Sequence, residues 1–120
     1  MSIVLSPQQA LRLLSDVALD VVRDKGPQNH PDFTFRQLSI LMTIYLEKPP
    51  HTVRGIAGRL GVTKPVVTRA LDSLGALELV TRRRDEADRR NVIVQRTVKG
   101  ALFVEQLGDL VADKAKGLAP

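Results

Sequence analysis

The sequence predicts a mainly α-helical fold that carries one small β-hairpin. Apolar residues recur every three to four positions through most of the 120-residue chain, which is the spacing of amphipathic helices. Segment 79–96 breaks this rhythm, because two runs rich in β-branched residues flank a charged stretch there. Aromatic residues make up only 3% of the chain, so the core must be aliphatic, which suits packed helices. We expect one domain, residues 1–120, in the order helix, helix, helix, helix, hairpin, helix.

Two capping boxes mark where the first two helices begin. Ser6 and Thr34 each stand three residues before a glutamine, so side chain and backbone satisfy each other's hydrogen bonds at the helix start. Glycine and proline at 26–27 are expected to end the first helix, and the prolines at 49–50 the second. The first helix carries an apolar stripe that consists of Leu11, Leu14, Val17, Ala18, Val21 and Val22.

Two shorter helices follow, with a tight turn between them. Thr52 is expected to cap the third helix, Gly61 to end it, and Thr63 to cap the fourth. This pattern is typical of a helix-turn-helix. The residues expected to face the core are Ile56, Ala57, Leu60, Val62, Val67 and Leu71. The outer side of the fourth helix is then formed by Thr63, Lys64, Pro65, Thr68 and Arg69.

The chemistry of this outer side suits the major groove of DNA. Small threonine hydroxyls allow close approach, Lys64 and Arg69 reach phosphates or guanine edges, and Pro65 fits against a thymine methyl group. An ordinary amphipathic helix with a polar outer face has the same pattern. The fourth helix alone therefore leaves both interpretations open.

The hairpin favours the DNA interpretation. Runs 79–83 and 92–96 are expected to pair, with residues 84–91 at the tip and Thr97 capping a last helix. Guanidinium groups on a protruding tip suit the narrow minor groove, where negative potential is concentrated. A self-neutralising loop that only confers solubility is the alternative. The tip residues expected to serve DNA binding are Arg84, Arg89 and Arg90, with Asp88 as a bidentate brace for a neighbouring arginine.

Positive charge is concentrated in the same part of the chain. The whole protein has a formal net charge of +5. Residues 52–100 hold eleven Lys and Arg against five Asp and Glu, a net of +6, and the remainder has a net of −1. A basic half beside a near-neutral one is the electrostatic pattern expected of a protein that binds a phosphate backbone.

Several classes of function lack their sequence signals. The chain has no cysteine, which excludes disulfides, thiol chemistry and Cys-ligated zinc. The two histidines, His30 and His51, stand without acidic or Cys partners at metal-ligand spacing, so no metal or cofactor is expected. No nucleophile–base pair or phosphate-binding glycine loop is present, so we expect no enzyme activity. Without a secretory signal or a long apolar stretch, a cytoplasmic protein with no membrane partner is expected.

Five short motifs occur through residues 52–100 at characteristic distances. They are Thr-Lys-Pro-Val-Val-Thr-Arg at 63–69, Leu-Asp-Ser-Leu at 71–74, Leu-Val-Thr-Arg at 79–82, Asp-Glu-Ala-Asp-Arg-Arg-Asn at 85–91 and Thr-Val-Lys-Gly at 97–100. Together they resemble the MarR family of bacterial winged helix-turn-helix regulators. The resemblance is sharp over 52–100 and rests on helix order alone over 6–47.

The resemblance implies a transcription regulator, most simply a repressor. It implies a homodimer that places each recognition helix in a major groove and each wing in a minor groove of a pseudo-palindromic duplex. Residues 52–100 would form the DNA-binding lobe, and 6–24 and 98–115 the dimerisation helices. The chain departs from the family in its short C-terminal region, where a single helix stands in place of two.

Two further questions stay open at the level of sequence. Many family members release DNA when a small aromatic compound binds, and such an effector would need a crevice that aromatic side chains line. The candidates, which are equally ordinary core residues, are Phe33, Phe35, Tyr45 and Phe103. The alternative function is a winged-helix module that binds another protein, or DNA without sequence preference, since the terminal helices carry apolar stripes that suit a partner.

Overall fold

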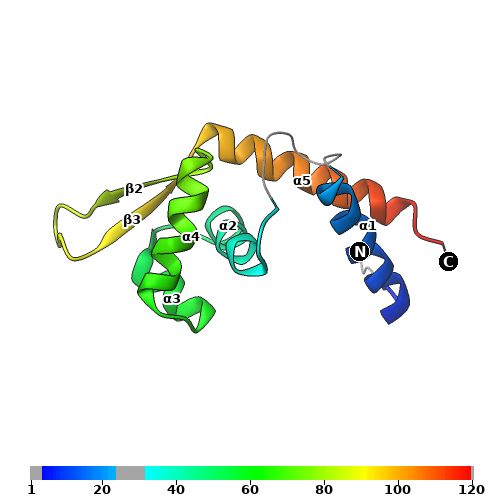
Figure 1. Ribbon diagram of the computed structural model, residues 1–120, viewed down its shortest axis with the longest axis horizontal. Helices are drawn as coiled ribbons and strands as arrows, with labels where there is room; N and C mark the ends of the chain where they lie inside the picture. Colours follow the sequence, from blue (N-terminus) through cyan, green and yellow to red (C-terminus); the bar gives the residue numbers. More distant parts are fainter. Residues whose placement is uncertain (1–3, 24–31, 120) are drawn as a thin grey trace. The chain divides into compact units, whose positions relative to one another are not determined.

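A computed structural model describes residues 4–23 and 32–119 of the chain (Figure 1). The predicted mainly helical fold with a β-hairpin wing is confirmed. The elements in chain order are α1 (Pro7–Val22), α2 (Phe35–Leu46), β1 (His51–Thr52), α3 (Val53–Leu60), α4 (Lys64–Ala76), β2 (Val80–Arg84), β3 (Val92–Arg96) and α5 (Val98–Lys116). The chain divides into two compact units, one of residues 33–104 and one of residues 1–32 with 105–120.

The unit of residues 33–104 has an aliphatic core, as the composition predicts. Its buried side chains come from the helices, the wing strands and the beginning of α5. They are Ile40, Leu41, Ile44, Val53, Ile56, Ala57, Val67, Ala70, Leu71, Leu74, Leu79, Val80, Val94 and Phe103. Phe33 packs edge-to-face on Phe103 with ring centroids 5.6 Å apart. The inward positions expected of the third and fourth helices are confirmed, although Leu60 and Val62 are only partly buried.

The hairpin belongs to a three-stranded antiparallel sheet in the order β1-β3-β2. Pairing of β2 with β3 confirms the predicted hairpin, with Arg84 opposite Val92 at its outer end. The sequence did not indicate β1, which pairs His51 with Val94. A strand of two residues shows no alternation of apolar and polar side chains, so its pairing depends on the tertiary fold.

Local hydrogen bonds confirm most of the predicted helix starts. Both capping boxes form, at Ser6 and at Thr34. Thr52 accepts a 2.9 Å hydrogen bond from the amide of Gly55. Thr97 Oγ1 accepts a 2.8 Å hydrogen bond from the amide of Gly100 at the beginning of α5.

The C-terminal end of α2 connects to the wing through one arginine. Arg96 at the end of β3 donates from Nε to the carbonyl oxygen of Ile44 at 2.7 Å and from Nη2 to that of Glu47 at 2.9 Å. Because cations near a helix C-terminus interact favourably with its unpaired carbonyls, Arg96 satisfies the end of α2 and anchors β3 to it.

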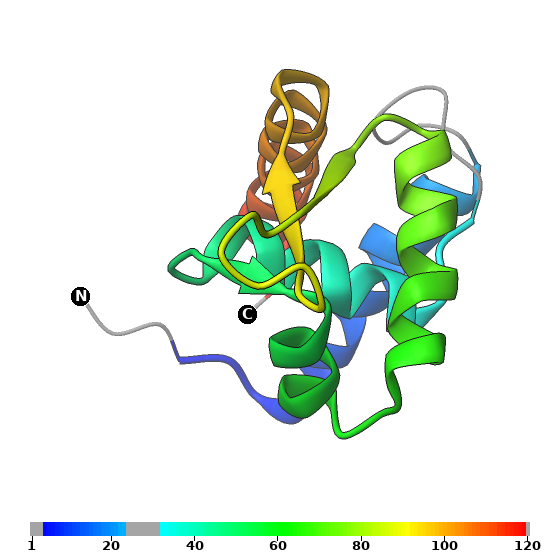
Figure 2. The same cartoon turned by 90° about the vertical axis from the view of Figure 1, so that its left-hand side faces the viewer.

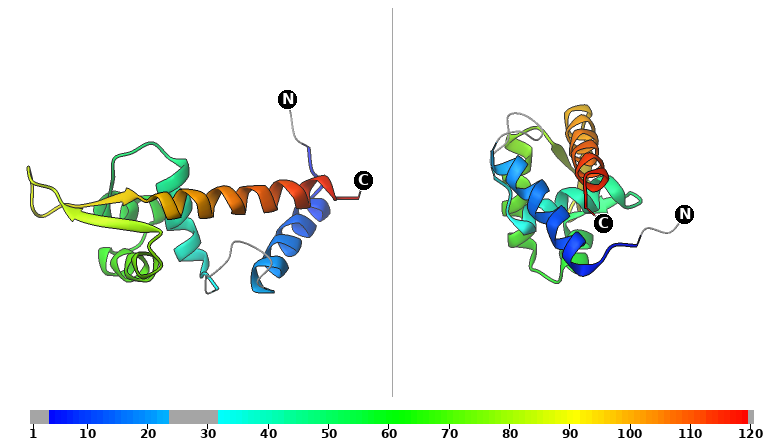
Figure 3. Two further views of the ribbon diagram at one scale, coloured as in Figure 1. Left: turned by 90° about the horizontal axis from the view of Figure 1, so that it is seen from above. Right: turned by 90° about the vertical axis from the view of Figure 1, so that its right-hand side faces the viewer.

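The second unit contains α1 and the C-terminal part of α5. Helix α5 itself is continuous from Val98 to Lys116 (Figure 3). Lys114 Nζ lies 2.8 Å from Asp20 Oδ2. No residue of α1 is buried, and its stripe residues Leu11 and Leu14 remain 67% and 55% exposed. The expected stop at residues 26–27 lies outside the described residues, and α1 ends at Val22. Across the described part of the chain, no helix combines the length and apolarity that a membrane span requires.

Candidate nucleic-acid interface

The turn between α3 and α4 depends on Gly61. Gly61 adopts a left-handed conformation with φ 69° and ψ 34°, which a residue with a Cβ rarely adopts. Directly after it, the amide of Val62 donates a 3.0 Å hydrogen bond to the carbonyl oxygen of Ala57. This confirms the predicted helix-ending glycine, and it redirects the chain into α4 within a few residues.

Helix α4 has one buried and one exposed face. The buried face consists of Val67, Ala70, Leu71 and Leu74. All five residues expected on the outer side are exposed, namely Thr63, Lys64, Pro65, Thr68 and Arg69. Packing of the buried face thus fixes the rotation of the helix and presents the polar face to solvent.

The beginning of α4 differs from the prediction in one respect. Thr63 occupies the N-cap position, but its side chain makes no capping hydrogen bond. Pro65, the second residue of α4, has no amide hydrogen, and the amide of Val66 at the third position, which the caps at Ser6, Thr34 and Thr52 use, does not pair with Thr63 here. The Thr63 hydroxyl therefore lies at the tip of α4 without a capping role.

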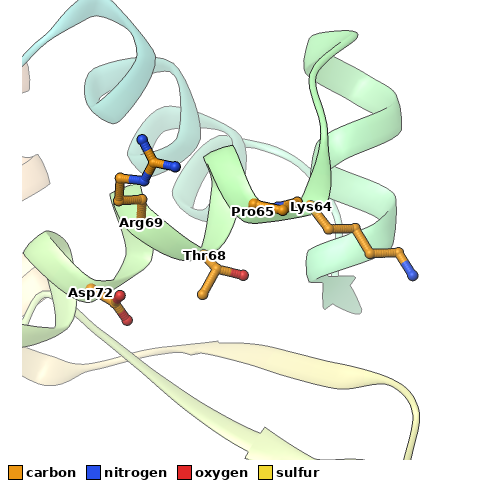
Figure 4. Close-up of a pocket in the computed structure, with 5 residues that line it drawn as sticks. All are labelled: Lys64, Pro65, Thr68, Arg69 and Asp72. Carbon is orange, nitrogen blue, oxygen red and sulfur yellow. The ribbon is translucent and has the colours of Figure 1, made fainter.

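A shallow hollow of about 440 Å³ lies along the exposed face of α4. Its lining residues are Lys64, Pro65, Thr68, Arg69 and Asp72 (Figure 4). Thr68 and Asp72 point to the side of the helix that faces the hairpin, whereas Arg69 extends to the other side. The hairpin and α4 lie next to each other within the unit of residues 33–104 (Figure 2).

The tip of the wing is held together by its acidic residues. Asp88 accepts from Arg90 through Oδ1 to Nε at 3.0 Å and through Oδ2 to Nη2 at 3.1 Å, so the expected bidentate brace forms. The hydrogen bond from Arg90 lowers the pKa of Asp88 below its ordinary value and raises that of Arg90. Asp85 Oδ1 accepts from the amide of Ala87 at 2.9 Å. The tip is therefore pre-ordered rather than a loose loop of charges.

Three predicted wing arginines occupy different environments. Arg90 is 85% exposed at the side chain even while paired with Asp88. Arg84 Nη1 donates a 3.1 Å hydrogen bond to the carbonyl oxygen of Arg89, so Arg84 holds the tip backbone. Arg89 is exposed. The brace by Asp88 is confirmed as a contact, and the roles of all four wing residues toward DNA stay predictions.

Sequence reasoning missed two features of this surface. Arg82 on β2 forms an ion pair with Asp72 on α4, with Nη2 and Oδ1 2.7 Å apart. Arg54 at the beginning of α3 lies close enough to Asp88 to lower its pKa further, behind the contribution of Arg90. Neither pairing follows from spacing in the sequence, because the partners belong to different elements.

Comparison with known proteins identifies the group to which this architecture belongs. A model of the MarR family matches residues 32–91, which is half of the chain. The chain belongs to the MarR family. The match extends the sequence resemblance of 52–100 upstream through α2. A search of curated proteins finds no match to this MarR-family chain.

Solved structures of similar fold include several transcription regulators. A transcriptional regulator from Thermotoga maritima is 30% identical with a TM-score of 0.65, over 92% of this chain and 78% of that one. The transcriptional repressor CouR, bound to a 23-mer DNA duplex, is 27% identical with a TM-score of 0.69, over 92% of this chain and 72% of that one. The S. aureus MepR–DNA complex, at 23% identity and a TM-score of 0.66 over 92% and 78%, shares the fold. This MarR-family chain is a DNA-binding transcription regulator.

Three of the four aromatic residues of this MarR-family chain have structural roles, and Phe35 does not. Phe103 is buried, Phe33 packs on it, and Phe35 is 79% exposed. Tyr45 donates a 2.6 Å hydrogen bond to the carbonyl oxygen of Leu79. These positions favour the interpretation as core and connecting residues over that of an effector crevice. The small-molecule effector stays a prediction from the family resemblance.

His51, the one histidine of the described part, shows no metal-binding arrangement. His51 is buried in β1, and its Nε2 lies 3.1 Å from the carbonyl oxygen of Glu47. His30 lies outside the described residues. Within residues 4–23 and 32–119, no cluster of His, Asp and Glu has the composition of a metal site.

Proposed function

We propose that this MarR-family protein acts in the cytoplasm as a homodimeric repressor that binds a pseudo-palindromic DNA site. In this proposal each subunit places α4 in a major groove and its wing in the adjacent minor groove. The observation that carries it is the pairing, within one compact unit, of a rigidly packed helix with an exposed polar face and a braced arginine tip.

The residues of α4 divide between backbone and base contacts in this proposal. Lys64 lies in the first turn and is exposed, so it would neutralise a phosphate. Thr68 and Arg69 lie one turn further along the exposed face and would contact base edges, with Arg69 suited to guanine. Pro65 would contact a thymine methyl, and the Thr63 hydroxyl would bind the backbone at the groove edge.

The wing would contribute Arg89 and Arg90 to the minor groove, and Arg90 is the preferred reader. Its side chain is 85% exposed, and the brace by Asp88 reduces the entropy lost on insertion. Arg84 would act through the tip backbone. Support for this proposal comes from the net charge of +6 in residues 52–100 and from the DNA duplex bound to CouR.

Dimerisation would use segments 6–24 and 98–115. Exposed apolar side chains occur on both helices, including Leu11, Leu14 and Val22 on α1 and Leu102 on α5. Burial of such side chains stabilises an association by about 25 cal/mol per Å² of apolar surface. Light scattering at tens of micromolar protein tests this part, and a monomer alone would contradict it.

Selection of bound fragments from duplex DNA with about 25 randomised base pairs tests the whole proposal. A dimer with two α4 helices should recover an inverted repeat whose half-sites are centred about one helical turn apart, 10–10.5 base pairs. Recovery of no preferred sequence would favour the alternative function, a winged helix that coats DNA or binds a protein. A protein-binding module would further lack the steep loss of DNA affinity with salt that counterion release causes.

A further inference from the structure

One ion pair connects the recognition helix to the wing. Arg82 Nη2 on β2 lies 2.7 Å from Asp72 Oδ1 on α4, and the two side chains are 32% and 62% exposed. The chain between these elements, from Leu77 to Leu79, turns sharply at Glu78, which has a positive φ of 62°. The ion pair is therefore a second link between α4 and β2, independent of the backbone turn.

Asp72 is the one acidic residue of α4 and lines the same hollow as Lys64, Thr68 and Arg69. A bare carboxylate on this face would repel the phosphates of bound DNA and weaken binding. Its ion pair with Arg82 neutralises it. The pairing therefore removes an electrostatic penalty that the proposed orientation of α4 would otherwise carry.

Arg82 is set apart from its neighbours by the register of the hairpin. Its partner across the sheet is Val94, which is buried, and Val80 two residues before it is also buried. Side chains alternate along a strand, so Arg82 leaves the face of β2 that packs on the unit, whereas Arg83 leaves the opposite face. Arg82 therefore points toward α4. Arg83, its neighbour on the same strand, points away from α4 and serves as a matched control.

We propose that the Asp72–Arg82 pair is a positioning element, which holds the wing at a fixed spacing from α4 so that both grooves are engaged together. This inference rests on the proposed function. Arg82 acts through Asp72 and makes no phosphate contact of its own. In the alternative, Arg82 contacts a phosphate directly and Asp72 is only a nearby repulsive charge.

Four variants of the full chain distinguish these roles: Asp72→Asn, Arg82→Gln, the double variant and Arg82→Lys, with Arg83→Gln as the matched control. Affinity is measured for the selected duplex and for a scrambled duplex across a salt series. For a positioning pair, each single change weakens binding to the selected duplex about three- to tenfold. The double variant then loses no more affinity than the single variant with the larger loss. In the double variant, which leaves no bare carboxylate, the salt slope and the binding of the scrambled duplex stay as before, and Arg82→Lys restores part of the affinity.

A direct phosphate contact gives a different pattern. Arg82→Gln would then reduce the salt slope by about one and weaken both duplexes, Asp72→Asn would strengthen binding, and the two effects would add. That pattern overturns the positioning role while leaving the proposed function intact. If the Asp72 and Arg82 variants have lower melting temperatures but unchanged affinity for the selected duplex, the positioning role is also overturned. Failure of the unaltered chain to select any duplex would overturn the proposed function and this inference together.

Discussion

The hydroxyl of Tyr45 donates a 2.6 Å hydrogen bond to the carbonyl oxygen of Leu79, immediately before β2. The hydroxyl oxygen of Tyr45 in turn accepts a 3.0 Å hydrogen bond from the amide of Thr97, just before α5. One phenol thus joins α2, the beginning of the wing and the beginning of the last helix. Because the wing is held at both strand ends by α2, its direction depends on this contact and on Arg96.

Replacing Tyr45 by phenylalanine should destabilise the fold by about 1–3 kcal/mol, since it leaves the Leu79 carbonyl and the Thr97 amide without this partner. Urea unfolding followed by circular dichroism measures the change. Phe35→Leu is the control, because Phe35 is 79% exposed and its replacement should change the free energy of unfolding by less than about 0.5 kcal/mol. Equal effects of the two substitutions would contradict the assigned role of the hydroxyl.

Two glycines of α5 should respond to alanine in opposite ways. A Cβ at Gly100 would collide with the Tyr45 hydroxyl and the Leu79 carbonyl oxygen, so Gly100→Ala should destabilise by about 1–3 kcal/mol or more. A Cβ at Gly108 meets no atom of the described residues within 4 Å, so Gly108→Ala should stabilise the helix by about 0.5–1 kcal/mol. Thermal unfolding of both variants tests the difference in sign.

Arg90→Ala should weaken binding to the selected duplex and reduce the slope of affinity against salt concentration by about one. The double change Arg89→Ala/Arg90→Ala should weaken binding further. Fluorescence anisotropy across a salt series gives both quantities. Arg12→Ala on α1 removes an equal charge outside the proposed interface and should leave the slope unaltered. Full affinity in the double variant would remove the wing from the proposed function.

Thr68→Ala and Arg69→Ala should relax sequence preference at individual base pairs, each by about 1–3 kcal/mol of discrimination. The measurement compares the selected duplex with single-base variants of it. Ser73→Ala, further along the exposed side of α4, is the control and should leave the preference intact. A uniform loss of affinity over all duplexes would assign Thr68 and Arg69 to the phosphate backbone instead.

The wing brace should be insensitive to pH throughout the neutral range. Arg90 lowers the pKa of Asp88 in the folded chain, so the contribution of the pair is fully present above the ordinary aspartate pKa and is lost as pH falls through the lowered value. An NMR titration of the Asp88 carboxyl measures this directly. Arg90→Ala should move the pKa of Asp88 back up toward its ordinary value, and an unchanged titration would contradict the pairing.

Sequence predicted the elements whose signals are local. The capping residues Ser6, Thr34 and Thr52, the turn at Gly61 and the hairpin all follow from side-chain chemistry acting over a few positions. The exposed face of α4 was also predictable, because burial of every third or fourth residue fixes the rotation of a helix.

Contacts between distant segments were not predictable in this way. Strand β1 exists because residues 51–52 meet β3, and the ion pair of Asp72 with Arg82 exists because the turn after α4 brings β2 back beside it. The capping hydrogen bond expected of Thr63 does not form, although Val66 at the third helical position has an amide hydrogen. Pairing of Asp88 with Arg90 was within reach, since the two residues lie two positions apart in a tight tip.

The two faces of α4 have a practical consequence. Val67, Ala70, Leu71 and Leu74 are buried in the core, whereas Lys64, Thr68 and Arg69 lie outside it. Exposed helix positions usually tolerate substitution within about 0.5 kcal/mol of stability. The proposed recognition surface is therefore separate from the residues that stabilise the fold, and a library randomised at those three positions alone should yield folded regulators that bind altered operators.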